Sequence, residues 1–349
     1  MIPRFILLAC LGGATLAAQQ PTSPDDAKRL LTALAADSME GRATGTRGAR
    51  RAATMIGSEM QRAGLQPLGD SGYFQRVPIS VDSVRVARAN QPVTWRLRPV
   101  LRESFAALDT VPEGRKPAAV NVVGVLRGGD PRLRDEVVLV DAHYDHLGMR
   151  GPGVDGDSIF NGADDDASGV TAVLEIARQL AHGPRPRRTI VFAATIGEEV
   201  GLLGTRWYID HPPIPLSQMV ANLEIEMIAR PDSLAGGAGR AWLTGYERST
   251  MGDLFAAHGI PIVADTRRDQ QFFMRSDNFA FAMRGIPAHT LSTFNLHRDY
   301  HQVTDDASKA DFGHMAGVIN AAARAVRVLT DGPKPEWKPG GKPEARQPH

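Results

Sequence analysis

The apolar run Val137-Val138-Leu139-Val140 leads directly into Asp141-Ala142-His143-Tyr144-Asp145-His146-Leu147-Gly148, and this stretch decides the fold. A short, β-branched apolar run is typical of a strand that is buried on both faces. His143 and Asp145 come where this strand ends, and alternate residues of an extended chain point the same way. The stretch therefore predicts a buried strand with two converging polar side chains at its carboxyl end.

An acidic run follows in Asn161-Gly162-Ala163-Asp164-Asp165-Asp166-Ala167-Ser168-Gly169. Apolar residues at helical spacing come next, at Val170, Leu174, Ala177 and Leu180. Carboxylates are favoured at a helix start by its free N–H groups and dipole, so a solvated, well-capped helix start is one interpretation. Three acids close to a His-x-Asp pair are also a typical metal-site composition, which is the second interpretation.

Strands and helices alternate along most of the chain. Strand patterns occur within 73–127 and over 189–195, 220–225, 241–243 and 286–292, and helix patterns over 24–36, 46–63, 249–258 and 310–329. This alternation predicts one α/β domain, residues 24–330, with a largely parallel sheet. Residues 331–349 are rich in Pro, Lys and Gly and are expected to form a disordered tail.

The charge of the chain is balanced, with 40 Lys and Arg against 39 Asp and Glu. Such a balance gives no electrostatic reason to expect nucleic acid or another polyanion as a partner. A local basic cluster is interpreted as a solvated helix face; it consists of Arg42, Arg47, Arg50, Arg51 and Arg62.

Residues 1–18 have the pattern of a secretory signal peptide, with Arg4, an apolar core over 5–11 and small residues at 14–18. The expected location is therefore secreted or periplasmic. A lipoprotein anchor at Cys10 is the alternative. The apolar core is too short to span a bilayer, so no integral membrane segment is expected in the mature chain. Cleavage near Ala18 would leave no cysteine, so any metal would rest on His and carboxylate ligands.

Several polar residues follow predicted strands, and sites in open α/β sheets form at the carboxyl ends of strands. They are His143, Asp145, Glu198, Glu199, Glu226 and His301, with Asp165 from the acidic run. Individually these residues have ordinary interpretations, namely a polar turn, an outward-facing edge position and a surface histidine. His146 competes with His143 as a ligand, and we favour His143 because of its spacing to Asp145. No His-Glu-x-x-His is present, which excludes the one-zinc helical motif.

Taken in order, five motifs resemble the M28 family of co-catalytic zinc aminopeptidases over residues 25–325. They are His143-Tyr144-Asp145, Gly162–Gly169, Glu198-Glu199, Glu226-Met227-Ile228 and Tyr300-His301. The resemblance implies a mostly parallel mixed sheet flanked by helices in three layers. It also implies a metallo-exopeptidase that releases the amino-terminal residue of peptides with a free amino terminus.

Residue by residue, the resemblance implies two Zn²⁺ ions bridged by Asp165. His143 and Glu226 would complete the ligands of the first ion, and Glu199 and His301 those of the second. Asp145 would hydrogen-bond the far nitrogen of His143. Glu198 would be the general base for a metal-bridging hydroxide, and Tyr300 would polarise the scissile carbonyl. The family position of Glu226 is often Asp, so the backbone there is expected to sit slightly back.

The resemblance places Ser276 and Asp277 near the substrate pocket, and we include Phe279 in the same pocket. Phe272, Phe273, Phe279 and Phe281 are interpreted either as a specificity pocket or as core. Other activities stay open: a carboxypeptidase or dipeptidase on the same two metals, a one-zinc glutaminyl cyclase-like enzyme, and an inactive binding protein. Charge counting supports two metals, because three carboxylates and a hydroxide balance two divalent ions.

Overall fold

The computed structural model describes residues 20–86, 93–151 and 156–344. The predicted signal peptide and Cys10 lie outside these residues. Within them, no helix is long and apolar enough to cross a membrane.

A nine-stranded mixed sheet forms the centre, in the order β1-β5-β9-β6-β10-β13-β11-β12 with β2 also paired to β5. Its members are β1 (Gln66–Pro67), β2 (Phe74–Val77), β5 (Ala119–Leu126), β6 (Val137–His143), β9 (Thr189–Thr195), β10 (Met219–Glu226), β11 (Ala241–Leu243), β12 (Ile262–Ala264) and β13 (Ala288–Ser292). The central run β9-β6-β10-β13 is parallel. Since parallel strands end at one edge, β6 and β10 deliver their last residues side by side.

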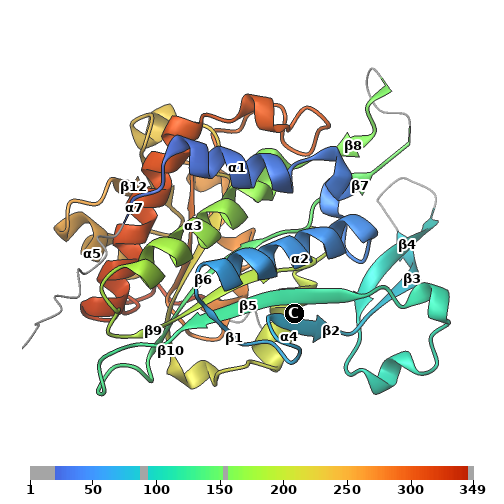
Figure 1. Ribbon diagram of the computed structural model, residues 1–349, viewed down its shortest axis with the longest axis horizontal. Coiled ribbons are helices and arrows are strands. Elements are labelled where there is room, and N and C mark those ends of the chain that lie inside the picture. The colour runs from blue at the N-terminus through green and yellow to red at the C-terminus, as the bar shows by residue number, and fades with distance from the viewer. Residues whose placement is uncertain (1–19, 87–92, 152–155, 345–349) are drawn as a thin grey trace, which may run out of the picture.

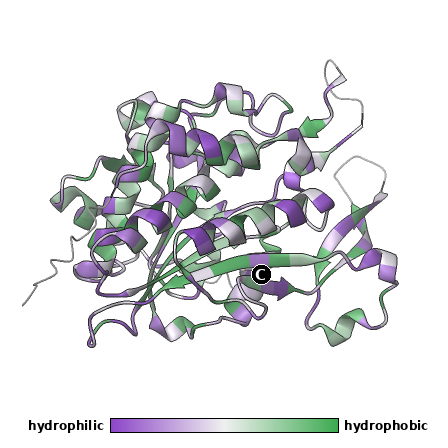
Figure 2. Ribbon diagram, viewed as in Figure 1, coloured by the Kyte–Doolittle hydropathy of each residue, from purple (hydrophilic) through white to green (hydrophobic). Residues whose placement is uncertain are grey.

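Helices cover both faces of the sheet, which gives three layers (Figure 1). One face packs against α1 (Pro24–Leu34), α2 (Arg47–Arg62), α3 (Gly169–His182), α5 (Met251–Ala257) and α7 (Phe312–Asp331), and the other against α4 (Leu203–Asp210) and α6 (Asn278–Met283). Strand alternation divides β6 accordingly, with Val138 and Val140 in one core and Val137 and Leu139 in the other. The three-layer prediction is confirmed, and Figure 2 shows the hydrophobic strands between helices that carry hydrophilic residues.

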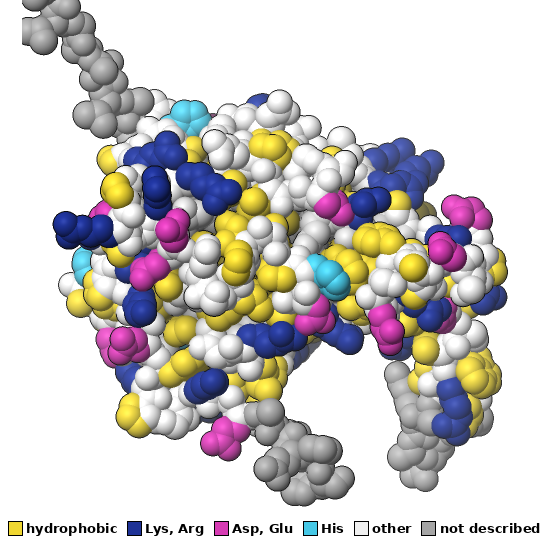
Figure 3. All heavy atoms as spheres, turned by 90° about the horizontal axis from the view of Figure 1, so that it is seen from below, with side chains coloured by type: hydrophobic (Ala, Val, Ile, Leu, Met, Phe, Trp, Pro, Cys, Tyr) yellow, Lys and Arg dark blue, Asp and Glu magenta, His cyan; other side chains and the backbone are white. Residues whose placement is uncertain are grey.

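Two hairpins project from the same end of this core (Figure 1). The larger consists of β3 (Ile79–Val86) and β4 (Thr94–Leu101), which pair only with each other. The smaller consists of β7 (Gly148–Met149) and β8 (Ile159–Phe160). On the face seen in Figure 3, Lys and Arg are interspersed with Asp and Glu, as the balanced net charge predicts.

The expected disordered tail is wrong for residues 332–344, which pack on the domain. The indole N–H of Trp337 donates to the carbonyl oxygen of Gly285 at 2.9 Å, and its ring lies against Phe273 and His289. Lys338 forms an ion pair of 2.7 Å with Asp253. The Pro and Gly content predicted disorder, but the half-buried Trp337 ring and the hydrogen bonds of the segment with Arg248 and Thr250 hold it on the domain.

Candidate metal centre

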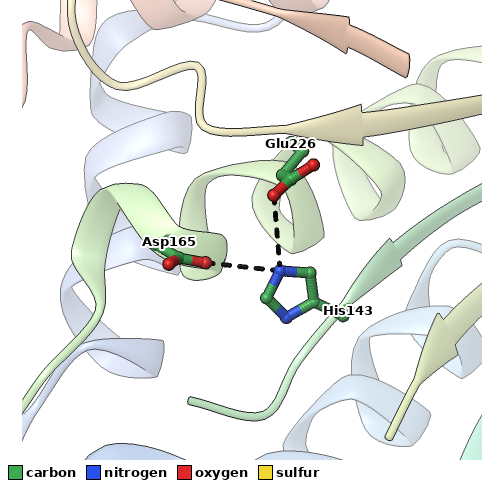
Figure 4. Close-up of side chains that lie close together, drawn as sticks. All are labelled: His143, Asp165 and Glu226. Carbon is green, nitrogen blue, oxygen red and sulfur yellow. Dashed lines mark ion pairs between the residues drawn. The ribbon is translucent and has the colours of Figure 1, made fainter. Parts of the chain in front are cut away.

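The first group of candidate ligands forms where β6 and β10 end. His143 is the last residue of β6 and Glu226 the last of β10, while Asp165 comes from the turn Ala163–Ser168 that precedes α3. The Nε2 atom of His143 lies 3.3 Å from Asp165 Oδ1 and 3.9 Å from Glu226 Oε1 (Figure 4). Three segments that are distant in sequence therefore point at one position.

A second group surrounds the other oxygen of Asp165. Nε2 of His301 lies 3.1 Å from Asp165 Oδ2 and 3.2 Å from Glu199 Oε2. Nδ1 of His146 lies 3.7 Å from Asp165 Oδ2 and 2.8 Å from Glu199 Oε1. Asp165 is thus shared by the two groups, with one oxygen toward each.

The sequence interpretation missed His146 by treating it as a competitor of His143. The structure gives each histidine its own group. The strand ends at His143, and the chain beyond it is no longer extended, so the two-residue alternation does not apply to His146. The pattern His-x-x-His just after a strand was the available signal.

The donor set fits metal ions. Several buried atoms of these groups lack a hydrogen bond of acceptable geometry, although charged partners are near: Nε2 of His143, both ring nitrogens of His146, and Oε1 of Glu199. An unsatisfied buried polar group costs about 1–3 kcal/mol, so such atoms rarely cluster without a reason. Imidazole and carboxylate donors suit zinc, and a divalent cation in each group would satisfy Nε2 of His143, Nδ1 of His146 and Oε1 of Glu199.

In the metal-free chain, the same contacts determine the protonation of the histidines. Burial opposes a charge on His143, but the carboxylates of Asp165 and Glu226 outweigh it and raise its pKa. For His301, burial is likewise outweighed by Asp165 and Glu199, which raise the pKa to about 9. Protons on the imidazoles therefore occupy the place of the cations, and metal binding is expected to release them.

Glu198 borders the same centre, and burial raises the pKa of its carboxyl strongly, with Glu226 adding to the effect. The carboxylate of Asp145 accepts the backbone N–H groups of Gly197 and Glu198 at 2.8 and 3.1 Å. It also accepts the hydroxyl of Thr44 at 2.8 Å. Asp145 thus holds the turn that presents Glu198.

The predicted role of Asp145 toward His143 needs a correction. The atom within hydrogen-bond distance of His143 Nδ1 is the carbonyl oxygen of Asp145, at 3.2 Å. The carboxylate Oδ1 is 3.9 Å away, because the N–H groups of the Gly197–Glu198 turn draw it elsewhere. The His143 ring is therefore oriented by the backbone.

The turn that carries Asp165 is fixed by carboxylates on either side. Asp305 accepts the N–H groups of Asp164 and Asp165 at about 3.1 Å. Asp166 accepts the N–H groups of Gly169 at 2.9 Å and Met227 at 3.0 Å. Since Met227 follows Glu226, Asp166 also ties the two ligand-bearing segments together.

Arg42 corrects the prediction of a solvated basic cluster, because its side chain is fully buried while the other four arginines are exposed. Its guanidinium donates to carbonyl oxygens of four residues: Leu34, Tyr144, Asn161 and Gly162. Two of these precede the Asp165 turn and one follows His143. A planar group with five donors is suited to joining such segments.

A pocket with aromatic and polar walls adjoins the centre on the Glu226 side. Its aromatic part, which we call the apolar pocket, is formed by Trp242, Phe272, Phe294 and Tyr300 together with Met227. The remaining lining is polar: Asp165, Glu198, Glu226, Thr244, Arg275, Thr290 and Ser292. The Tyr300 ring stacks on His301 at 3.9 Å. Burial and the carboxylates of Asp165 and Glu226 raise the pKa of its phenol, so it remains a proton donor at neutral pH.

The predicted pocket residues lie elsewhere. Ser276 donates to Glu224, Asp277 accepts from Thr195, and Phe279 packs against Phe273. Of the four phenylalanines considered, Phe272 lines the pocket, whereas Phe273 and Phe281 belong to the core. The lining comes from β11, from residues 272–275 before α6 and from the loops after β10 and β13, which no local motif marks.

A second set of buried carboxylates lies two residues further back on the same strands. Asp141 and Glu224 are register partners on β6 and β10, and Asp277 begins α6. Glu224 accepts from the hydroxyls of Ser276 and Thr290 at 2.5 and 2.8 Å. Burial and the charge of Asp277 raise the pKa of Asp141 to about 8, and Asn222 donates to it at 2.6 Å.

Known structures share this architecture. The fold is similar to that of BSAP, a zinc aminopeptidase from Bacillus subtilis, with a TM-score of 0.62 and 16% identity over 90% of this chain and 96% of that one. A glutaminyl cyclase from Porphyromonas gingivalis is similar as well, with a TM-score of 0.58 and 17% identity over 87% of this chain and 97% of that one. At these identities the likeness shows the fold alone.

The sequence itself shows the family. The model of peptidase family M28 matches residues 121–326, which is more than half of the chain, so the protein belongs to peptidase family M28. The chain is also 28% identical over 243 residues to a probable leucine aminopeptidase 2 from Aspergillus oryzae, a match over 60% of this chain. That match spans only 44% of the relative's own length.

Proposed function

We propose that this chain is a two-zinc aminopeptidase that hydrolyses the first peptide bond of peptides with a free amino terminus. The observation that carries the proposal is the shared position of Asp165 between two histidine–carboxylate groups, beside the buried Glu198. The family membership and the similarity to aminopeptidases support it.

In this proposal, His143, Asp165 and Glu226 would hold one zinc ion. Asp165, Glu199 and His301 would hold the other, with His146 as a further ligand of the second. When bound, the zinc ions would activate water and polarise the scissile carbonyl. The Glu198 carboxylate accepts the proton of the attacking water and returns it to the leaving amine. The Tyr300 phenol donates a hydrogen bond to the carbonyl oxygen as charge develops there.

The apolar pocket would receive the side chain of the terminal residue. Its aromatic walls, Trp242, Phe272 and Phe294, lie within contact distance of one another, with ring centroids 5.2 and 5.9 Å apart. They would exclude water and favour apolar terminal residues. Nucleic acid and membrane have no role in the proposal.

The test is a panel of four substrates measured with and without chelator: leucine p-nitroanilide with a free amine, its amino-acetylated form, an amino-acetylated peptide with a free carboxyl-terminal leucine, and a peptide that begins with Gln. We expect cleavage of the free-amine p-nitroanilide and of the Gln peptide, abolished by chelator and restored by zinc, and no cleavage of the two acetylated substrates. Cleavage of the acetylated peptide with the carboxyl-terminal leucine would favour the carboxypeptidase reading. Cyclisation of the Gln peptide without cleavage would favour the cyclase reading.

Glu198→Gln then tests the assignment of the base. The variant should keep two zinc ions by mass spectrometry while kcat falls by about 10²–10⁴-fold. Glu113→Gln, an exposed carboxylate far from the centre, is the matched control and should be unaffected. A metal-loaded Glu198→Gln variant with normal turnover would reject this role.

A further inference from the structure

A cleft opens on the opposite side of the metal centre from the apolar pocket. It has a volume of about 610 Å³ and is lined by Ala43, Thr44, Arg96, Leu97, Arg98, Pro99, His146, Leu147, Arg150, Glu199 and Val200. The arginines come from β4 and from the residue after β7, so the cleft borders both of the hairpins that project from the core. Its size is that of a site for a small ligand or a few residues of peptide.

The cleft is cationic, and its cations are unpaired. In the described part of the chain, no carboxylate forms an ion pair with Arg96, Arg98 or Arg150. Asp82, the cross-strand neighbour of Arg98, is instead engaged by Arg102 at 2.6 Å. Other surface arginines, such as Arg76 with Asp70 at 3.2 Å, do have partners.

Among the residues that the structure describes, Glu199 is the one acidic side chain that lines the cleft, and its oxygens face His146 and His301. The guanidinium of Arg150 lies 5.3 Å from the Phe160 ring centre, which keeps it at the cleft without neutralising it. Three guanidinium groups therefore line a space that begins at a candidate metal ligand.

An exopeptidase must bind the substrate on both sides of the scissile bond: the terminal residue on one side and the departing part of the peptide on the other. If the terminal residue enters the apolar pocket beside Glu226, the departing part of the peptide leaves past Glu199, into the arginine cleft. Guanidinium groups recognise carboxylates through paired, charge-assisted hydrogen bonds.

We propose, on the basis of the proposed function, that the arginine cleft binds a carboxylate on the departing side of the substrate. The carboxylate is either the carboxyl terminus of a short peptide or an Asp or Glu side chain just after the scissile bond. The enzyme would then prefer di- and tripeptides or acidic peptides over neutral, amidated ones.

Four peptides separate these sources: Leu-Gly-Gly, its amide, Leu-Glu-Gly-amide and Leu-Gln-Gly-amide. We expect kcat/KM to be about 3- to 30-fold higher for a carboxylate-bearing peptide than for its neutral match. The preference should shrink between 50 and 500 mM salt, since exposed charges are screened. A preference confined to Leu-Gly-Gly assigns the cleft to the terminus, and one confined to Leu-Glu-Gly-amide assigns it to the side chain.

Two variants on different elements test the residues: Arg96→Gln with Arg98→Gln on β4, and Arg150→Gln after β7. Both should reduce the preference and leave cleavage of Leu-Gly-Gly-amide unchanged. Arg85→Gln is the matched control, because Arg85 pairs with Trp95 in register and so lies on the other face of the same hairpin from Arg96.

Equal rates for carboxylate and amide peptides in the parent enzyme would overturn the proposal. So would a preference that survives both cleft variants, or one removed by Arg275→Gln, which would place the anion at the apolar pocket instead. Titration of the four peptides into the Glu198→Gln variant measures the same preference as a ratio of Kd values. Absence of all aminopeptidase activity would refute the proposed function, whereas equal Kd values would refute the cleft.

Discussion

The candidate metal centre and the buried carboxylate cluster behind it lie on the same two strands, and each takes a glutamate from β10. Glu226 and Glu224 are two residues apart on β10, as His143 and Asp141 are on β6. At the metal centre the carboxylates face histidines, which can release protons and become ligands. In the cluster behind, they face hydroxyls and amides, which cannot. We infer that the groups facing the carboxylates, and not the carboxylates themselves, determine whether a set of buried acids can bind cations or stays protonated.

Asp165→Asn should have the largest effect on this comparison. The amide loses the charge that both groups share, so we expect bound zinc to fall from two ions per chain to below one. Activity should fall by at least about 100-fold. Metal analysis and kcat/KM measure the two losses. A variant that keeps both ions would show that Asp165 does not bridge them.

Metal removal should come next in size. An ion held at 1,000 times its Kd stabilises the folded state by about 4 kcal/mol, so chelator should lower the thermal midpoint by several degrees. Calorimetry with and without added zinc measures this shift. An identical midpoint in both states would mean that the two groups hold no ion at working concentrations.

Burial also disfavours the charged form of a histidine, His289, as it does for the buried carboxylates. Burial lowers its pKa to about 4, and the ring contacts Ser249 and the carbonyl oxygen of Thr244. The unfolded chain binds this proton near pH 6.5, so stability is complete above that pH and is lost as pH falls toward 4, by at most about 3 kcal/mol.

In urea titrations from pH 7 to 4, His289→Gln should therefore lose less stability than the parent. His182→Gln, at an exposed histidine, is the control and should follow the parent curve. Parallel curves for His289→Gln and the parent would contradict the burial argument.

Asp141→Asn should have the smallest effect. With a pKa of about 8 the side chain is largely protonated at pH 7, and an amide has the same shape. Activity should stay within about 3-fold, zinc content should not change, and stability should stay within about 1.5 kcal/mol. Loss of zinc in this variant would contradict the inference that only the carboxylates of the candidate metal centre take part in metal binding.

The sequence predicted those features that the sheet alone determines. The alternation of strands and helices predicted the α/β domain, and the rule that sites form at the carboxyl ends of strands predicted that His143 and Glu226 belong to one cluster; their positions at the ends of adjacent parallel strands agree with this. The three layers were implied by the resemblance to family M28. His146 and the carboxylate of Asp145 depend on the backbone path after the strand. The pocket walls Trp242 and Phe294 come from strand β11 and from the loop after β13, and their meeting depends on how these distant segments pack. The ordered tail at Trp337 could not be predicted, because composition describes a whole segment and does not reveal what one tryptophan packs against.

Arg42 has a consequence for how the ions come and go. The permanent positive charge of Arg42, held by four carbonyl oxygens, joins the segments around His143 and Asp165 without the help of a metal ion. We therefore expect the ligand-bearing segments to keep their positions when the metal is removed. The protein should release and rebind its ions repeatedly without unfolding, and should accept another divalent ion at the same ligands.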